Sequence, residues 1–573
     1  MKSIAHFPKR ILLLCFRIMP FVFFILLLGI ALILYDDYGG FTDEILEIQT
    51  AAVNAKYILS KFPAWFANTE ISVPIIGKLQ NMPDLLSYDD RTYGTAVMMP
   101  SIFINQIPGV ELNAAQFLNF RRFYTFLNFY FAMIAFFILL KIRFKNALIA
   151  LTGTIMLMLT PRFFAESFYN CKDIVFFSWV MVCLCGIGWY MMKNSRWGLV
   201  LFCFGFAFAA NTRLAGFFLW PAFLIISGLN HWIRKIRNPN IIRSWLLALI
   251  VSLLLFYAVT PYLWGSPTTR LSEGIRFSSS QITDRETELL TEANLKPLGQ
   301  AELFLGNYVD TKQIWYYLPV WMGITIPVFY ILLFMAACFG IGSSVLPAIL
   351  KRKFSADLLF DWFCLAFFLT GLIGIILLKM NLYNGWRHAY FLYAPFIYLA
   401  VLGFQALLSM PVKNHVLRTC KNAALLCMML YSFFSTGSWV LRNHPLDFVY
   451  FNEIGRNYAQ QFSRDYWGVA SKNCILDLLK EFNGRRISLD LNADYTWGSI
   501  EYSLMRLPQK EQDKFDPVWK TENAEYLCYS YKNTPGNQHS IPDFEMIKTY
   551  AIDGYDVAAI YKRVRNFKWP GAE

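Results

Sequence analysis

Long apolar runs, separated by short polar stretches, recur along most of the chain. Several runs reach about 20 residues, the length of a helix that crosses the hydrocarbon core of a bilayer, and they carry very little charge. The pattern predicts about eleven membrane-spanning helices. Their expected ranges are 11–35, 123–140, 147–160, 174–192, 198–210, 214–229, 245–263, 318–341, 358–378, 390–410 and 423–440.

Other segments have a mixed polar and apolar pattern. In the loop 35–120, "AAVNAKYILSKF" and "NAAQFLNFRRFYTFL" place apolar residues at helical spacing, which predicts helices lying in the membrane interface. After residue 440 the composition becomes that of a soluble domain, with a helix expected at "SKNCILDLLKEF" and strands at "RRISLDL", "AEYLCYSY" and "YDVAAIYKRV". We therefore expect an α-helical polytopic membrane module, 1–440, followed by a small external α/β domain, 441–573.

The charges decide the expected topology. The net charge is +13, but Lys and Arg gather in clusters at 2–10, 141–145, 193–196, 234–243, 351–353 and 413–421, after every second apolar run. This is the positive-inside pattern, and it accounts for much of the charge without a nucleic acid partner. It predicts a cytoplasmic N-terminus and a periplasmic or lumenal C-terminus. The run 11–35 is too long for an ordinary signal peptide and has no small-x-small cleavage site, so it is expected to remain as the first span.

With this topology, the unusual acidic residues lie on the outer face. The stretch "YDDYGGFTDEILEIQT" follows the first span and contains Asp36, Asp37, Asp43 and Glu44. Asp36 and Asp37 fit a solvated helix end. Gly39 and Gly40 permit a tight turn that would return Asp43 and Glu44 to the membrane surface. A carboxylate held there can accept a proton from a nucleophilic hydroxyl.

Cations gather on the same face. Lys172 lies beside Asp173 at the start of the fourth span, Arg213 follows the fifth, and Arg387 and His388 precede the tenth. A lipid phosphate at the outer leaflet would account for these cations. The alternatives are pairing with lipid headgroups or with Asp and Glu for the cations, and helix-dipole capping for Asp173.

These motifs resemble those of the GT-C superfamily of membrane glycosyltransferases, in the branch of protein O-mannosyltransferases and lipid A aminoarabinose transferases. "GGFTDEILE" resembles the family's Asp-Glu motif, "YNCKDIVF" its second acidic motif, and "NTRLAGFFLWP" and "YNGWRHAYFLYAP" its outside turns with a cation. The Asp-Glu pair here lacks the aromatic or His neighbours of the protein mannosyltransferases. The tail matches none of their accessory domains.

The resemblance implies sugar transfer, with inversion, from a polyprenyl-phosphate carrier to an acceptor hydroxyl on a protein or glycolipid. Asp43 would be the base, and Glu44 would orient Asp43 or the acceptor. Asp173 would position a sugar hydroxyl or share a divalent metal with Asp43. Lys172, Arg213, Arg387 and His388 would hold the phosphate.

Some features stay open at the level of sequence. Two carboxylates alone make a weak cation site, so a divalent metal is an open prediction. Trp264, Trp315, Tyr316, Tyr317 and Trp321 fit an interfacial aromatic belt better than a sugar-stacking role. A transporter or flippase of lipid-linked sugars and a non-catalytic membrane scaffold are the alternative functions. The expected location is a bacterial inner membrane, with an internal eukaryotic membrane as the alternative.

Overall fold

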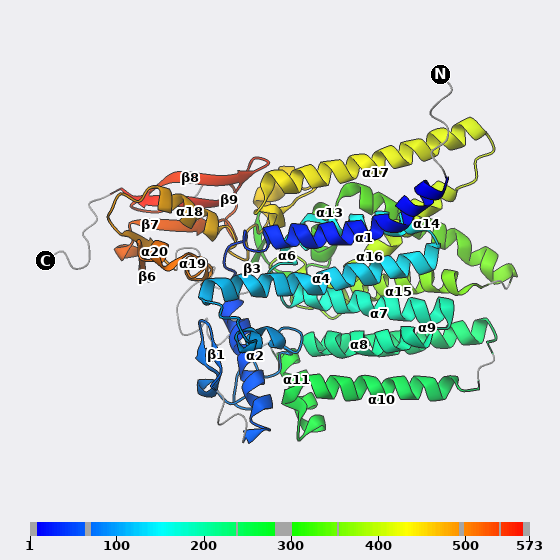
Figure 1. The fold of residues 1–573 in the computed structure, drawn as a ribbon. Helices are drawn as coiled ribbons and strands as arrows, with labels where there is room; N and C mark the ends of the chain where they lie inside the picture. Colours follow the sequence, from blue (N-terminus) through cyan, green and yellow to red (C-terminus); the bar gives the residue numbers. More distant parts are fainter. Residues whose placement is uncertain are drawn as a thin grey trace.

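The structure is a computed structural model that describes residues 9–63, 70–236, 239–280, 301–351, 354–491, 498–537 and 540–564. Figure 1 shows a bundle of long helices with a small sheet domain at one end. The bundle helices are α1 (Lys9–Leu34), α4 (Ala114–Phe144), α5 (Ala147–Met158), α7 (Asp173–Lys193), α8 (Arg196–Thr212), α9 (Leu219–Ile233), α10 (Ile241–Val259), α14 (Val328–Lys351), α15 (Ala356–Leu377), α16 (Tyr393–Ser409) and α17 (His415–Asn443).

All of the apolar runs seen in the sequence are helical, and all but the run 318–341 form one main helix. Among the described residues, eight helices are long and apolar enough to cross a membrane, and a bent pair of helices makes a ninth span if it crosses as one. Helices α5 and α8 are shorter apolar helices. Helix α7 lies at the centre, and 89% of its most apolar stretch is buried. Helices α1 and α10 are peripheral, with 17% of the corresponding stretch buried in each. Helices α7 and α8 pack closely because Gly186 has no side chain. A Cβ at this position would lie only 2.7 Å from the Phe202 nitrogen.

The predicted continuous span 318–341 is wrong. The chain forms α13 (Tyr317–Thr325), then bends by 119° before α14. Pro327 stands at the break and cannot donate a backbone hydrogen bond to a continuing helix. Tyr317 and Trp321 on α13 are fully buried, so these two residues are not part of an aromatic belt, whereas Trp315 is 68% exposed.

The two predicted interfacial helices have different outcomes. Helix α2 (Glu44–Leu59) contains "AAVNAKYILSKF" up to Leu59 and lies across the end of the bundle, as Figure 1 shows. The segment "NAAQFLNFRRFYTFL", in contrast, is the first part of α4, so its prediction as a separate interfacial helix is wrong. A capping box between Asn113 and Gln116 starts α4, and no Gly or Pro interrupts its 31 residues.

The C-terminal part has two sections. An irregular section with the short helices η7 (Asp447–Val449) and η8 (Arg456–Gln461) packs on the bundle. The domain that follows contains α18 (Ser471–Lys480), α19 (Ser499–Leu504), α20 (Gln509–Gln512) and a five-stranded sheet of order β6-β5-β7-β9-β8. The strands are β5 (Ile487–Asp490), β6 (Phe515–Val518), β7 (Tyr526–Ser530), β8 (Phe544–Ile552) and β9 (Tyr555–Arg563). The predicted helix and all three predicted strands are confirmed.

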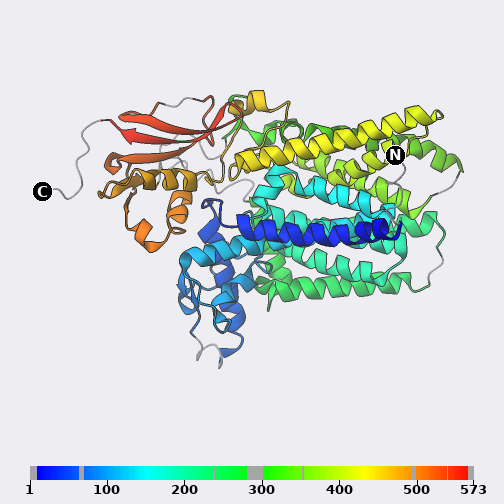
Figure 2. The ribbon, with the colours of Figure 1, turned by 45° about the horizontal axis from the view of Figure 1, so that its top comes forward.

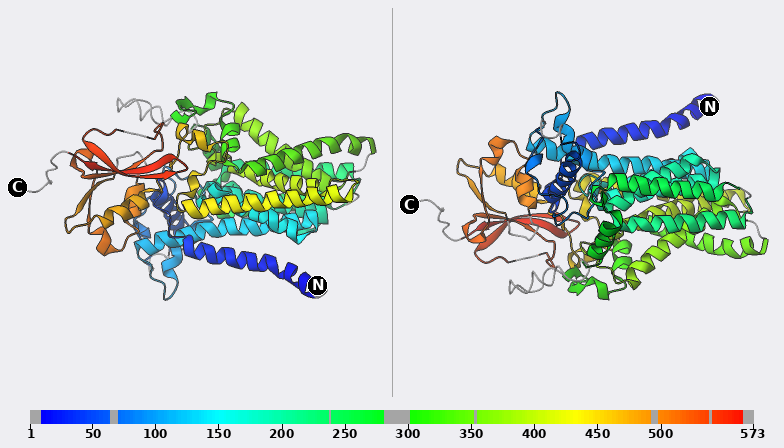
Figure 3. Two further views of the ribbon diagram at one scale, coloured as in Figure 1. Left: turned by 90° about the horizontal axis from the view of Figure 1, so that it is seen from above. Right: turned by 90° about the horizontal axis from the view of Figure 1, so that it is seen from below.

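The polar segments gather at one end of the bundle. Figures 2 and 3 show the sheet domain and the segment around α2 beyond the same end, with the first turns of α1 at the opposite end. The short helix α6 (Pro161–Glu166), η3 (Leu214–Phe218), η4 (Pro261–Leu263), α11 (Pro267–Ser280), the hairpin β3 (Ala301–Phe304) and β4 (Asn307–Asp310), and η6 (Arg387–Leu392) lie in the connections at that end. The predicted common face of the acidic and basic motifs is therefore present in the fold.

Candidate active site

The acidic stretch after α1 is held between the bundle and the C-terminal section. Asp37 accepts a hydrogen bond from the imidazole of His444, with 2.8 Å between Oδ2 and Nε2. Glu44 is buried and forms ion pairs with Arg506 at 2.5 Å and Arg122 at 3.7 Å. Glu47, one turn further along α2, forms an ion pair with Lys172. Three of these acids are therefore tied to cations from remote parts of the chain.

Asp43 differs from these neighbours. It occupies the N-cap position of α2 without capping it through its side chain, and it is half-buried. Within the described part of the chain, no Lys, Arg or His forms an ion pair with it. Its carboxylate nevertheless interacts electrostatically with Lys172 and Arg387. Asp43 is thus a carboxylate close to cations but bonded to none of those described.

Burial and charge control the Lys172–Glu47 pair. Burial raises the pKa of Glu47, and Lys172 opposes that effect. Burial alone would lower the pKa of Lys172, but Glu47 and Asp43 together raise it above its ordinary value. Lys172 also lies 4.2 Å from the centre of the Tyr93 ring. The ammonium group therefore remains charged at neutral pH, next to Asp43.

Asp173 forms the second centre of the site. It is the first residue of α7, is 1% exposed, and forms ion pairs with Arg213 and with Arg387, the latter at 3.5 Å. Asn170 supports it: the Asp173 backbone amide donates to the Asn170 side chain at 2.8 Å. The connections before α7, after α8 and before η6 thus meet at one carboxylate.

The basic side chains Arg213 and Arg387 and the imidazole of His388 retain buried hydrogen-bonding groups without a described partner. Buried Nε of Arg213, Nε of Arg387 and Nδ1 of His388 have no hydrogen-bond partner among the described residues. The Arg387 guanidinium also lies 4.5 Å from the centre of the Trp467 ring and 5.0 Å from that of Tyr383. Buried polar groups of this kind are costly unless something binds them, which fits an anionic ligand beside Asp173.

A buried acid that the sequence motifs did not include lies beside this centre. Glu166, at the end of α6, accepts hydrogen bonds from Tyr390 at 2.7 Å, Tyr466 at 2.6 Å and Asn170 at 2.6 Å. Burial raises the pKa of Glu166, and these three donors oppose the rise. The signal in the sequence was a carboxylate inside the aromatic turn "PRFFAESFYN".

Residues of the C-terminal section also belong to the site. Tyr466 donates a hydrogen bond to Glu166, and the Trp467 ring stacks on Arg387. The Trp467 carbonyl accepts a hydrogen bond from the backbone amide of Thr42, at 3.2 Å. Aromatic side chains in a soluble-looking tail gave no sequence signal for this role. The predicted boundary at residue 440 therefore separates hydropathy classes, while the site draws on both sides of it.

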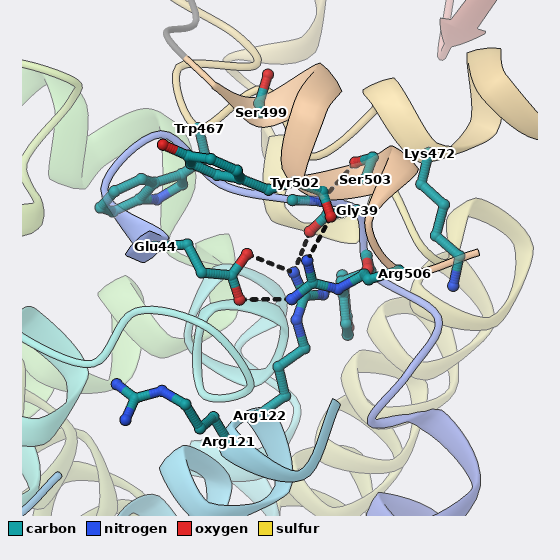
Figure 4. A network of polar contacts seen from close by, with 12 residues as sticks. Gly39, Glu44, Arg121, Arg122, Trp467, Lys472, Ser499, Tyr502, Ser503 and Arg506 are labelled. Atoms are coloured by element: carbon teal, nitrogen blue, oxygen red, sulfur yellow. Dashed lines mark hydrogen bonds and ion pairs between the residues drawn. The ribbon is translucent and has the colours of Figure 1, made fainter. Parts of the chain in front are cut away.

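The predicted site residues thus fall into two neighbouring groups. Lys172 lies with Asp43, whereas Arg213, Arg387 and His388 surround Asp173. Glu44 points into a different network, between Arg122 and Arg506 (Figure 4).

The acids do not make an evident metal site. Asp173 is already held by two guanidinium groups, and the described residues contain no group of three His, Cys, Asp or Glu side chains that could hold a metal ion. The donor set therefore does not fit a resident divalent metal, and no chemical step is assigned to one.

Trp264, one of the predicted belt residues, contacts Tyr57 of α2 and Tyr257 of α10. It lines a groove of about 580 Å³ together with Tyr57, Lys61, Leu86, Tyr257, Gly265 and Arg270.

Comparisons with known proteins give a similarity at the level of structure. No family model and no curated protein sequence matches the chain. One solved structure to which the chain is similar is the crystal structure of ArnT from Cupriavidus metallidurans bound to undecaprenyl phosphate. The sequence identity is 10% and the TM-score 0.40, with 95% of this chain and 98% of that chain covered.

Proposed function

We propose that the protein is an inverting glycosyltransferase that moves a sugar from a polyprenyl-phosphate carrier to an acceptor hydroxyl. The observation that carries the proposal is the placement of Asp43, a carboxylate without an ion pair among the described residues, beside Lys172 and the Asp173–Arg213–Arg387 cluster. A base for the acceptor and positive charge for a leaving phosphate are the two groups that this reaction requires. The motif resemblance points to the same chemistry.

Each group has a defined part in the proposed reaction. Asp43 takes the proton of the acceptor hydroxyl as its oxygen attacks the anomeric carbon of the sugar. The bond between that carbon and the phosphate oxygen breaks, and the carrier phosphate leaves with the electron pair. Arg213 and Arg387 hold this phosphate, since a guanidinium has five N–H donors and Asp173 uses only part of them. Asp173 holds the guanidinium groups of Arg213 and Arg387 in place.

The membrane position fits a lipid carrier. The cationic groups lie at the ends of membrane-spanning helices, where the phosphate of a lipid would be found, with the polyprenyl chain in the bilayer. We propose that this end faces the periplasm or lumen, and that the acceptor is a protein or glycolipid exposed there.

The test is sugar transfer by the purified protein. A panel of polyprenyl-phosphate sugars would be incubated with envelope lipids and proteins as acceptors, and both the released lipid phosphate and the transferred sugar would be measured. Asp43→Asn keeps the shape of the side chain but cannot take the proton, so transfer should fall by roughly 10² to 10⁴. Binding of the carrier should persist.

Asp36→Asn is the matched control, because its side chain forms no ion pair with any described residue and it lies in the same loop. It should transfer sugar at nearly the wild-type rate. Wild-type protein that releases no lipid phosphate from any carrier would refute the proposal. Movement of intact carrier across vesicles would instead indicate a flippase. Normal transfer by Asp43→Asn would remove Asp43 from the mechanism.

A further inference from the structure

The C-terminal domain reaches directly into the loop that carries Asp43. The Gly40 amide donates to the Ser503 hydroxyl of α19 at 2.6 Å, and the Thr42 amide donates to the Trp467 carbonyl. A Cβ at Gly39 would lie 2.1 Å from the Val469 carbonyl oxygen, and one at Gly40 would lie 2.6 Å from the Ser499 carbonyl oxygen. Only glycine permits this close backbone approach at the two positions.

Glu44 joins this contact to the bundle. It follows Asp43 directly and is 3% exposed, between Arg506 of the C-terminal domain and Arg122 of α4 (Figure 4). Arg122 also donates to the carbonyls of Tyr38 and Gly39, and Arg506 donates to the Tyr502 carbonyl at 2.9 Å. Buried guanidinium groups therefore hold the loop before Asp43 from both sides.

Such a contact has consequences for geometry. A buried ion pair adds little net stability but fixes the relative position of its partners, and the loss of one partner leaves a buried charge uncompensated. Here the fixed partners are the first turn of α2 and the bundle, and Asp43 lies at the start of that turn. Base catalysis is sensitive to displacements of about 1 Å.

We infer that Arg506 is a positioning residue through which the C-terminal domain sets the location of Asp43. The inference rests on the proposed function for its effect on catalysis. Arg506 contacts Glu44 and the Tyr502 carbonyl, and it acts on Asp43 through the adjacent residue in the chain. Ser503 acts in the same way through the Gly40 amide. The α/β domain is then part of the catalytic unit, because it supplies the contacts to Gly40 and Glu44 that hold the Asp43 loop.

The experiment combines kinetics with amide hydrogen exchange in the full-length protein. Arg506→Gln removes the charge, Arg506→Lys keeps it without the fork, and Ser503→Ala removes only the hydroxyl. We expect kcat in Arg506→Gln to fall roughly 10- to 100-fold, while the KM for the carrier stays near the wild-type value. Arg506→Lys should recover part of kcat. The amides of Gly40 and Thr42 should exchange faster in all three variants.

Arg563→Gln is the control within the same domain. Arg563 donates to the carbonyls of Ala524 and Thr521, which lie outside the Asp43 loop, so kcat and exchange at Gly40 and Thr42 should not change. Should Arg506→Gln fail to fold, Ser503→Ala carries the same two measurements.

Unchanged kcat and unchanged exchange in folded Arg506→Gln would overturn the inference, as would equal losses in Arg563→Gln. The exchange measurement needs no substrate. A protein that transfers no sugar but shows the expected exchange would refute the proposed function and leave the positioning of the loop confirmed.

Discussion

At the scale of single residues, the carboxylates that follow α1 differ in their interaction partners. Asp37, Glu44 and Glu47 each form an ion pair with a cation from a remote segment, whereas Asp43 forms no ion pair with any of the described residues. These ion pairs hold the first three carboxylates against remote segments of the chain. Asp43 is not held in this way, and it is the carboxylate to which the proposed function gives the role of base.

Arg387 offers a test of the proposed phosphate contact. Arg387→Lys keeps the positive charge but loses the planar fork that can hold Asp173 and a phosphate together. We expect carrier affinity to fall roughly 10- to 100-fold, the range for a lost hydrogen bond to a charged group. Binding of a labelled carrier to the purified protein measures this directly.

The matched control for Arg387→Lys is Arg442→Lys. Arg442 is also an arginine at the end of a long helix, but it is exposed and bonds only the Ser438 carbonyl among the described residues. Its substitution should leave affinity unchanged. Equal affinities of Arg387→Lys, Arg387→Ala and the wild type would show that Arg387 serves Asp173 alone.

At the scale of elements, the loop before α2 is joined to α17 where the bundle ends. His444 caps α17 and lies between Asp37 at 2.8 Å and Asp447 at 3.6 Å. Burial would lower the pKa of His444, but its hydrogen bond to Asp37 and the nearby carboxylate of Asp447 raise it to about 9. The charged imidazole thus ties the acidic loop to the last membrane helix.

This contact predicts a pH-dependent stability. Because the pKa is raised in the folded state, its contribution is fully present below the unfolded value of about 6.5 and is lost as pH rises through about 9. We expect a contribution of about 1 kcal/mol, since Asp37 is partly exposed to solvent.

Thermal unfolding in detergent, compared between wild type and His444→Gln, measures the contribution of the charged His444 to stability. The two proteins should differ clearly at pH 6 and converge above pH 9. A difference that stays constant over this pH range would contradict the assignment.

At the scale of the whole molecule, the chain forms one bundle whose chemistry is collected at a single end. The apolar runs cross the bundle in alternation. The connections α4–α5, α7–α8 and α16–α17, which lie at or beside basic clusters, are at the opposite end from the C-terminal domain (Figure 1). If the basic end is cytoplasmic, the site and the sheet domain are external.

Reporter fusions test this topology. A periplasmic reporter fused after Glu573 should be active, and the same reporter fused after Lys413, in the connection between α16 and α17, should be inactive. Activity at both positions, or at neither, would mean that α17 does not cross the membrane. Activity after Lys413 but not after Glu573 would mean that a crossing before α17 is miscounted. The bent pair α13–α14 would then be the first segment to re-examine, because it counts as one span only if the two helices together cross the membrane once.

The sequence by itself determined the order and approximate limits of the membrane helices, the strands of the C-terminal domain and the common face of the charged motifs. Hydropathy, strand pattern and alternation are local properties, so a single chain is enough to detect them. The sequence also selected Asp43, Asp173, Arg213 and Arg387, because charges at the ends of apolar runs are unusual.

Only the tertiary structure decided which charges meet. Glu44 and Arg506 are 462 positions apart, and Arg387 reaches Asp173 across 214 positions. Such pairing depends on distances between folded elements, and no local pattern encodes them. The burial of Glu166 was decided in the same way, since its partners Tyr390 and Tyr466 are remote in the chain.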